Sequence, residues 1–372
     1  TAYVEKTDTD PILQGDFDIS ACALRSGYSG CGGSSTIPPG RFADFGLLQA
    51  YGFVPIAASD MCVLNAAGFC RMDLKVVGDT FENRAGQAYN YNPTNYFQRP
   101  DTRYNAGLFG HYDINDRATA YVESRYMKSE SVAQIAYSGT FGNITRFPCY
   151  NPLMSAQQYN VLCGQWTGMG GDHAPDFASG AAALAYISGL DIAVGNGDII
   201  DYGAPTYHLK RNVEGNPRQG AFFYKNFVNV AGIRGDINDR WSYDVNVQAT
   251  RVDYQNEYRN DLSVTAINRA VDIVSINGVP TCVSALNGTD SSCMPYPLFN
   301  GGLPGDGGLQ GVWDGGQELQ NYIANATYIN GNLKQTIVSG YISGELGFSI
   351  AGGPNAQLVL GFENKEMSSD YR

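Results

Sequence analysis

The chain of 372 residues carries 24 Lys and Arg against 36 Asp and Glu, a formal charge of −12 at pH 7. That balance argues against nucleic acid as a partner, because neutralising phosphates requires a basic face. Charged residues make up only 16% of the chain, where soluble proteins average about 25%. No stretch approaches the roughly 20 apolar residues of a membrane-spanning helix, so a helical membrane protein is excluded.

Alternating side chains predict a first pair of strands near residues 106–114 and 117–128. A change of side-chain type at every second residue is the period of a strand with two different faces. A tight turn over residues 113–116 joins the two runs. The apolar set is Ala106, Leu108, Gly110, Tyr112 and Ile114 in the first run and Ala118, Ala120 and Val122 in the second, opposite Asn105, His111, Asp113, Glu123 and Arg125.

The clearest strand covers residues 241–250 and is preceded by another over 231–236. Trp241, Tyr243, Val245, Val247 and Ala249 share one face, and polar residues fill the other. The connecting turn over 236–239 has the same four residues as the turn at 113–116. A third hairpin is predicted from the alternation in residues 338–348 and 355–363, with its turn at 351–354.

Long stretches separate these hairpins, from about residue 132 to 218 and from 258 to 333. Unpatterned loops of that size are unusual in a compact soluble domain. Short turns at one end and long loops at the other are typical of outer-membrane barrels. A soluble β-sandwich also alternates, but the polar faces here are rich in amides and acids, as a water-filled lumen requires. We therefore predict an all-β fold, an antiparallel transmembrane β-barrel with long extracellular loops and short periplasmic turns.

Eight cysteines fall in close sequential couples outside the strongest strands. Couples of this kind favour disulfides in an oxidising compartment, and their spacings lack the short C-x₂₋₄-C signature of zinc sites. Each bridge would close a local loop and contribute roughly 2–3 kcal/mol. The predicted pairs are Cys22 with Cys31, Cys62 with Cys70, Cys149 with Cys163, and Cys282 with Cys293.

Several ordered motifs resemble the barrel of TonB-dependent receptors of the proteobacterial outer membrane. The resemblance covers nearly the whole chain, and its specificity lies in the order of the motifs. The matching runs are residues 10–16 and 33–36, then 89–100, 103–106 and 110–116, then 211–218, 232–236, 241–244 and 361–366.

This resemblance implies that residues 1–372 are part of a 22-stranded receptor barrel, with the plug domain and the C-terminal strands outside this sequence. It implies an outer-membrane protein that binds a scarce ligand at its extracellular loops and imports it with energy from the TonB complex. Partners would be that complex, outer-membrane lipid and an unidentified small molecule.

No catalytic motif for nucleophilic, phosphate or zinc-protease chemistry is present, so we expect no enzyme activity and no cofactor. Ligand capture is expected in residues 133–217 and 258–332, because loops built on a rigid scaffold often carry function. Flat rings there could stack on a sugar or an aromatic ligand, although packing within the loops is the other reading. The candidate ligand-binding residues are Tyr150, Tyr159, Trp166, Tyr207 and His208.

Two other functions remain open from the sequence. A passive porin would share the barrel, the loops and the acidity, but would rely on a constriction instead of a plug. A secreted or surface β-rich adhesin would share the disulfides and tyrosines, but would be soluble without detergent.

Overall fold

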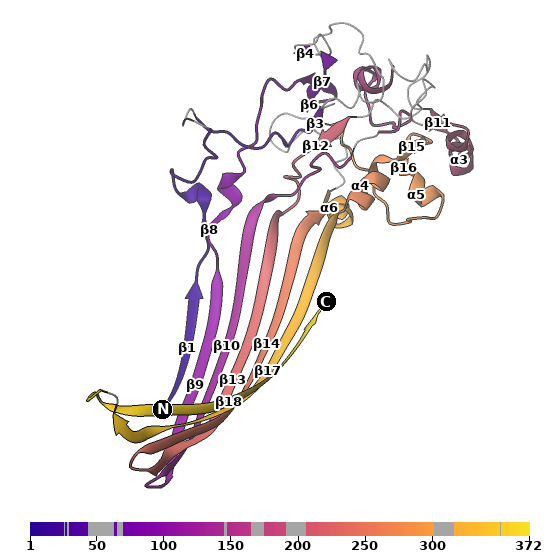
Figure 1. Cartoon of the computed structure of the whole chain (residues 1–372). Helices are drawn as coiled ribbons and strands as arrows, with labels where there is room; N and C mark the ends of the chain where they lie inside the picture. Colours follow the sequence, from indigo (N-terminus) through magenta and orange to yellow (C-terminus); the bar gives the residue numbers. More distant parts are fainter. Residues whose placement is uncertain are drawn as a thin grey trace.

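The chain is built mostly from antiparallel β-strands with a few short helices. Seven long strands form one curved sheet, and the long segments that connect some of them gather at one end of it (Figure 1). No helix in the described part of the chain is both long and apolar enough to cross a membrane. The computed structural model describes residues 1–25, 27, 30–43, 63–64, 70–144, 147–164, 175–190, 206–300, 316–349 and 351–372.

The large sheet is a meander in which each strand pairs antiparallel with its neighbours in chain order. Among the described residues, the two edge strands do not pair with each other, so the sheet is open. Its strands are β1 (Ala2–Thr9), β9 (Asp101–Asn115), β10 (Ala118–Tyr137), β13 (Pro217–Asn238), β14 (Trp241–Leu262), β17 (Ala324–Ser349) and β18 (Asn355–Tyr371).

The predicted strands and their three short turns are present, but the sheet is larger than the pattern indicated. β13 and β14 each span 22 residues and β17 spans 26, because pairing continues past the ends of the apolar alternation. β1 was not predicted. No tight turn links it to β9, and the pairing of Ala2 with Leu108 joins residues that lie far apart in the sequence.

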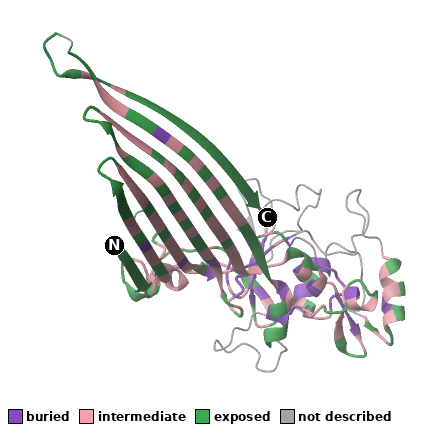
Figure 2. Cartoon of the chain, turned by 90° about the horizontal axis from the view of Figure 1, so that it is seen from below, coloured by how far each residue is buried: buried purple, intermediate pink, exposed green. Residues whose placement is uncertain are grey.

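The apolar face of this sheet is also its more exposed face. Val245 and Val247 on β14 are 46% and 42% exposed, and Ile233 on β13 is 44% exposed, whereas the alternate residues Asn246 and Gln248 are less exposed. Side chains on the concave side of a curved sheet converge and cover one another. Because the apolar residues are the more exposed ones, we assign them to the convex side. Figure 2 shows this alternation as stripes along the strands.

On the convex face, the part of each strand next to the short turns carries apolar or uncharged residues, which we call the apolar band. Charged residues on this face begin only beyond the band, farther from the short turns. The first are Lys128 on β10 and Lys225 on β13, which pair directly across the sheet. On the next two strands the first are Arg251 and Lys334, which also pair with each other. On its other side, Arg251 pairs with Phe227 of β13. Phe227 lies on the same face as Lys225 and two residues nearer the turn, so Arg251 is nearer the turns than Lys225 by the same step. The boundary therefore slants across the sheet.

We call the described residues of the three long connecting segments, 10–100, 138–216 and 263–323, the cap. A four-stranded sheet in the cap has the order β12-β3-β6-β7, and a three-stranded sheet has the order β11-β15-β16. The strands of the cap are β2 (Ile12–Leu13), β3 (Arg41–Ala43), β4 (Val63–Leu64), β5 (Cys70–Arg71), β6 (Asp73–Val77), β7 (Thr80–Asn83), β8 (Tyr96–Gln98), β11 (Asp176–Phe177), β12 (Tyr207–Leu209), β15 (Ile273–Ile276) and β16 (Val279–Cys282). Its helices are η1 (Gln14–Asp16), η3 (Asn92–Thr94), α2 (Ala156–Tyr159), η4 (Asn160–Gly164), α3 (Gly180–Ser188), α4 (Val264–Val271), α5 (Val283–Leu286) and α6 (Gly316–Ile323).

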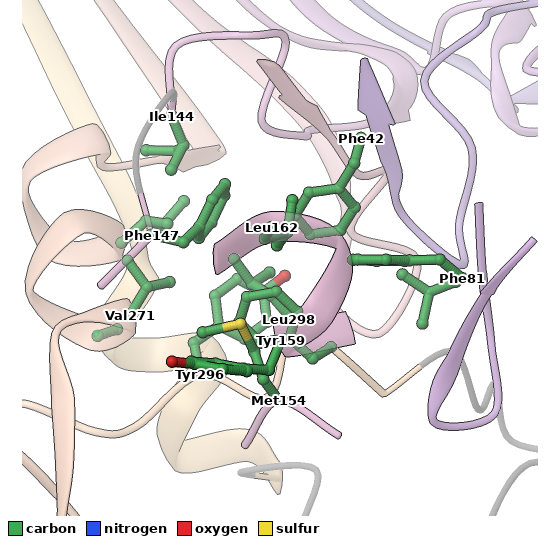
Figure 3. Close-up of a cluster of buried hydrophobic side chains, with 14 of the residues drawn as sticks. Phe42, Phe81, Ile144, Phe147, Met154, Tyr159, Leu162, Val271, Tyr296 and Leu298 are labelled. Atoms are coloured by element: carbon green, nitrogen blue, oxygen red, sulfur yellow. The ribbon is translucent and has the colours of Figure 1, made fainter. Parts of the chain in front are cut away.

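The cap has its own hydrophobic core, to which all three segments contribute (Figure 3). The ring of Phe42 lies at its centre, with centroid distances of 4.8 Å to Phe81, 5.2 Å to Phe147 and 5.6 Å to Phe299. Fully burying such a ring stabilises a fold by roughly 1.5–3 kcal/mol. The long connections are thus a packed unit that unites residues from the three segments.

Within the described residues, three disulfides brace the cap: Cys22–Cys31, Cys149–Cys163 and Cys282–Cys293. Each joins two cysteines that are close in the sequence, as their spacing predicts. The predicted partner of Cys70, Cys62, lies outside the described residues. Side-chain hydrogen bonds fasten the cap to the sheet, among them Ser138 to Asp261 on β14 and Arg211 Nη1 to the carbonyl oxygen of Tyr137 on β10, at 2.8 Å.

Candidate functional site

A pocket of about 450 Å³ opens in the cap between helices α4 and α5. Its size falls in the range of about 300–1,000 Å³ that is usual for small-molecule sites. Its lining includes both polar and apolar side chains, and apolar atoms make up the larger share of the wall. The lining residues are Pro148, Thr265, Asn268, Arg269, Val271, Asp272, Val283, Ser284, Asn287 and Thr289.

Helix α4 supplies one wall because its two faces differ. Ser263 caps its N-terminus, with the hydroxyl accepting a hydrogen bond from the backbone N–H of Ala266 at 3.2 Å, as N-cap serines typically do. Ile267, Ala270 and Val271 are buried in the cap core. The helical period therefore places Asn268 on the exposed side, toward the pocket.

Helix α5 and the loop after it form the opposite wall, closed by the Cys282–Cys293 disulfide. Asp290 in this loop accepts hydrogen bonds from Arg269 Nη1 at 2.8 Å, from the Tyr322 hydroxyl at 2.9 Å and from the Ser292 hydroxyl at 2.7 Å. The hydrogen bonds from Ser292 and Tyr322 lower the pKa of Asp290 to about 2. A carboxylate that stays ionised ties α4, α6 and this loop together.

The floor of the pocket joins two of the long segments. The Tyr150 hydroxyl donates to Asp272 at 2.6 Å, and the Asn151 side-chain amide donates to the carbonyl oxygen of Val271 at 2.9 Å. Burial raises the pKa of Asp272 above the usual value for an aspartate. The pocket therefore depends on the contact between residues 148–151 and residues 271–272.

Ser284 is the most distinctive residue of the pocket wall. It is 7% exposed, and its hydroxyl oxygen has no hydrogen-bond partner within the described part of the chain. Buried polar groups without partners are rare and costly in proteins. The hydroxyl oxygen is itself buried from solvent, so a ligand in the pocket would reach it only after a shift of the wall. Other lining side chains, among them Asn268 and Asn287, offer hydrogen-bonding groups beside the apolar part of the wall.

Of the aromatic side chains expected to bind a ligand, none that the structure describes lines this pocket. Tyr150 and Tyr159 are 2% and 6% exposed and pack in its hydrophobic clusters, so protein atoms cover both rings. Tyr207 lies half-buried in β12, and Trp166 is outside the described residues. That these side chains bind a ligand stays a prediction, and among the described ones Tyr150 is close to the pocket, through its hydrogen bond to Asp272.

His208 is fully buried beside the aromatic core. Its Nδ1 lies 2.8 Å from the Thr140 hydroxyl, and its ring centroid is 4.8 Å from that of Phe42. Burial, with a smaller contribution from the charge of Lys210, lowers the pKa of His208 to about 3. The imidazole is therefore neutral at physiological pH and acts as part of the core. Within the described residues, no group of three or more His, Cys, Asp or Glu side chains could hold a metal ion.

The pocket residues were not singled out from the sequence, although the segment that carries most of them was. Residues 264–271 do show a helical apolar pattern behind Ser263, which is the signal that could have identified α4. Ser284 gave no such signal, because its burial depends on packing against other segments.

Comparison with protein-family models, curated proteins and solved structures found no match for this chain.

We expect Ser284→Ala to stabilise the cap by about 1 kcal/mol, because it removes a buried hydroxyl that has no partner. Hydrogen exchange of the α5 and β16 amides would measure the change. The matched variant Ser138→Ala, which removes a buried hydroxyl bonded to Asp261, should destabilise its surroundings. Faster exchange in Ser284→Ala would show that the hydroxyl is satisfied in the folded cap.

The cap should lose stability in mild acid because of His208. The folded state holds this residue neutral, whereas the unfolded chain takes up a proton near pH 6.5, so acid favours unfolding. The free energy of cap opening should fall by up to about 1.4 kcal/mol per pH unit below pH 6.5. Hydrogen exchange of β12 from pH 7 to 4.5 would test this, and His208→Asn should flatten the dependence. An unchanged slope in the variant would contradict the assignment.

Proposed function

We propose that this chain is a barrel section of an outer-membrane receptor that captures a scarce ligand with its cap and imports it with energy supplied by TonB. The observation that carries the membrane part is the exposed apolar face of the large sheet. A folded protein in water buries such a face, whereas a membrane barrel turns it toward lipid.

The width of the apolar band supports this location. On β14 the convex face is uncharged from Trp241 to Ala249 and charged from Arg251 onward. Nine residues agree with the roughly 9–11 that a tilted strand needs to cross the hydrocarbon core. The rest of a 22-residue strand would extend beyond the bilayer and hold the cap away from it.

The slant of the charged boundary supports a tilted barrel. Lys128 and Lys225 mark the boundary on β10 and β13, and it lies one same-face position nearer the turns on β14 and β17, at Arg251 and Lys334. When strands are tilted from the membrane normal, a level interface crosses neighbouring strands at successively shifted positions. A single flat membrane interface would therefore account for the shift of the charged boundary from strand to strand.

The two ends of the sheet also differ as they do in outer-membrane receptors. Three short turns close one end, and a disulfide-braced cap with a pocket covers the other. Disulfides fit an extracellular position of the cap, and a pocket held by preformed contacts binds with less loss of entropy. The dependence on TonB is supported by the ordered motifs alone.

The face assignment predicts opposite outcomes for neighbouring residues. Val245→Arg should cost about 2–4 kcal/mol if it lies near the bilayer midplane. Asn246→Arg should be much milder, since the concave side can hydrate a charge. Urea titrations of the full-length protein folded into phosphatidylcholine vesicles would measure both. Equal losses would mean that the convex face does not meet lipid.

Import can be separated from binding through the pocket. Small molecules that co-purify with the full-length receptor would be identified by mass spectrometry and then labelled for uptake assays. Removal of TonB should leave binding intact and stop accumulation in the cell. Asn268→Trp, which fills the pocket, should abolish both, while Ala182→Trp on the exposed side of α3 should change neither. Unchanged uptake without TonB would contradict an energy-coupled receptor and favour a passive porin.

A further inference from the structure

We infer that four basic residues on the convex face form a binding site for the phosphate groups of anionic lipids in the leaflet next to the cap. We call Lys128, Lys225, Arg251 and Lys334 the basic collar. The inference rests on the membrane location proposed above, and does not depend on the TonB-driven import.

Like charges face each other twice in the basic collar. Lys128 of β10 pairs directly with Lys225 of β13, and Arg251 of β14 pairs directly with Lys334 of β17. Side chains of directly paired residues lie on one face with Cβ atoms about 4.5–5.5 Å apart, and like charges in such pairs are destabilising. An anion bound between them would remove this repulsion.

The acidic residues nearby leave this charge only partly neutralised. Lys128 pairs with Glu130 at 2.6 Å, and Arg251 pairs with Asp253 at 3.0 Å. Asp253 is also the cross-strand partner of Lys225, and Glu366 lies exposed on β18 opposite Thr336. Lys225 and Lys334 themselves form no salt bridge in the part of the chain that the structure describes.

Position gives the ligand its class. Below the basic collar, toward the short turns, the convex face of the same strands is uncharged and includes Phe227, Val247 and Val338. On their own strands, Glu130 lies two residues farther toward the cap than Lys128, and Asp253 two residues farther than Arg251. The cationic groups therefore border the apolar band directly, where a lipid places its phosphate. A soluble anion has no acyl chains that could cover the adjoining apolar surface, whereas a lipid has.

A second cluster of the same kind lies at the edge of the sheet. Tyr104 of β9 pairs with both Lys6 and Lys128, whose ammonium nitrogens lie 5.7 Å and 5.9 Å from the centroid of its ring. Amphipathic rings beside cations are typical of membrane interfaces. Together with Lys6, the row of basic residues spans the sheet from β1 to β17.

The test measures the selectivity of the full-length protein for anionic lipid. Spin-labelled phosphatidylglycerol and phosphatidylcholine would be compared for immobilisation at the protein surface in mixed bilayers of the two lipids. The wild-type protein should prefer phosphatidylglycerol. Lys225→Gln and Lys334→Gln should each reduce that preference by up to about fivefold at low salt, and added salt should weaken it in all variants.

The matched control is Lys365→Gln, because Lys365 lies on the concave face of β18, opposite Ile337. This variant should keep the wild-type preference. Equal effects of Lys365→Gln and Lys225→Gln would overturn the site, since net charge alone would then explain the selectivity. Glycerol 3-phosphate that displaces the lipid as well as phosphatidylglycerol does would also overturn it, in favour of a simple anion site.

The result separates this inference from the proposed import. Loss of selectivity in the collar variants with TonB-independent uptake would support the lipid site and reject the receptor. A full-length protein that does not enter bilayers would reject the lipid site together with the membrane location.

Discussion

The antiparallel ladder of the seven long strands is the constraint on which the other features depend. Direct pairing fixes which residues share a face, and a slip of one residue would exchange the two faces completely. Between Thr119 and Ile135 of β10 the register to β13 has no irregularity. The same holds for β14 and β17 between Trp241 and Tyr258. The apolar band, the charged boundary and the basic collar all follow from this register.

The ladder also determines where the protein can be irregular. Register shifts cluster at the two ends of the strands, as at Ile135 and Tyr137 near the cap and at Asp236 and Asn238 near a turn. Backbone groups in a membrane must be paired because no water is present to satisfy them. The proposed location and the position of the irregularities are therefore consistent. The cap consists of the long connections between strands and lies outside this constraint. It can therefore contain helices, small sheets and a pocket.

The cap solves a different problem from the sheet. Its segments bury Phe42, Leu298 and other apolar side chains around one core, as a soluble domain does, while the large sheet exposes its apolar residues. Disulfides and the hydrogen bonds around Asp290 and Asp272 reinforce that core where the pocket interrupts it. The protein thus combines an exposed apolar surface on the large sheet with a buried apolar core in the cap. The basic collar lies between the two.

The sequence alone determined the strands and their short turns. Period-two alternation is a local property, so it is sufficient to assign Val245 and Asn246 to opposite faces of their strand. The cysteine spacing likewise indicated local bridges such as Cys282–Cys293. β1 escaped prediction because its partner β9 is remote in the sequence. Only the tertiary structure decided that the long connections share a core, that Tyr150 and His208 are buried inside the cap, and that Ser284 lines a pocket. Those features arise from contacts between three segments, and burial by a distant segment leaves no periodic trace in the sequence.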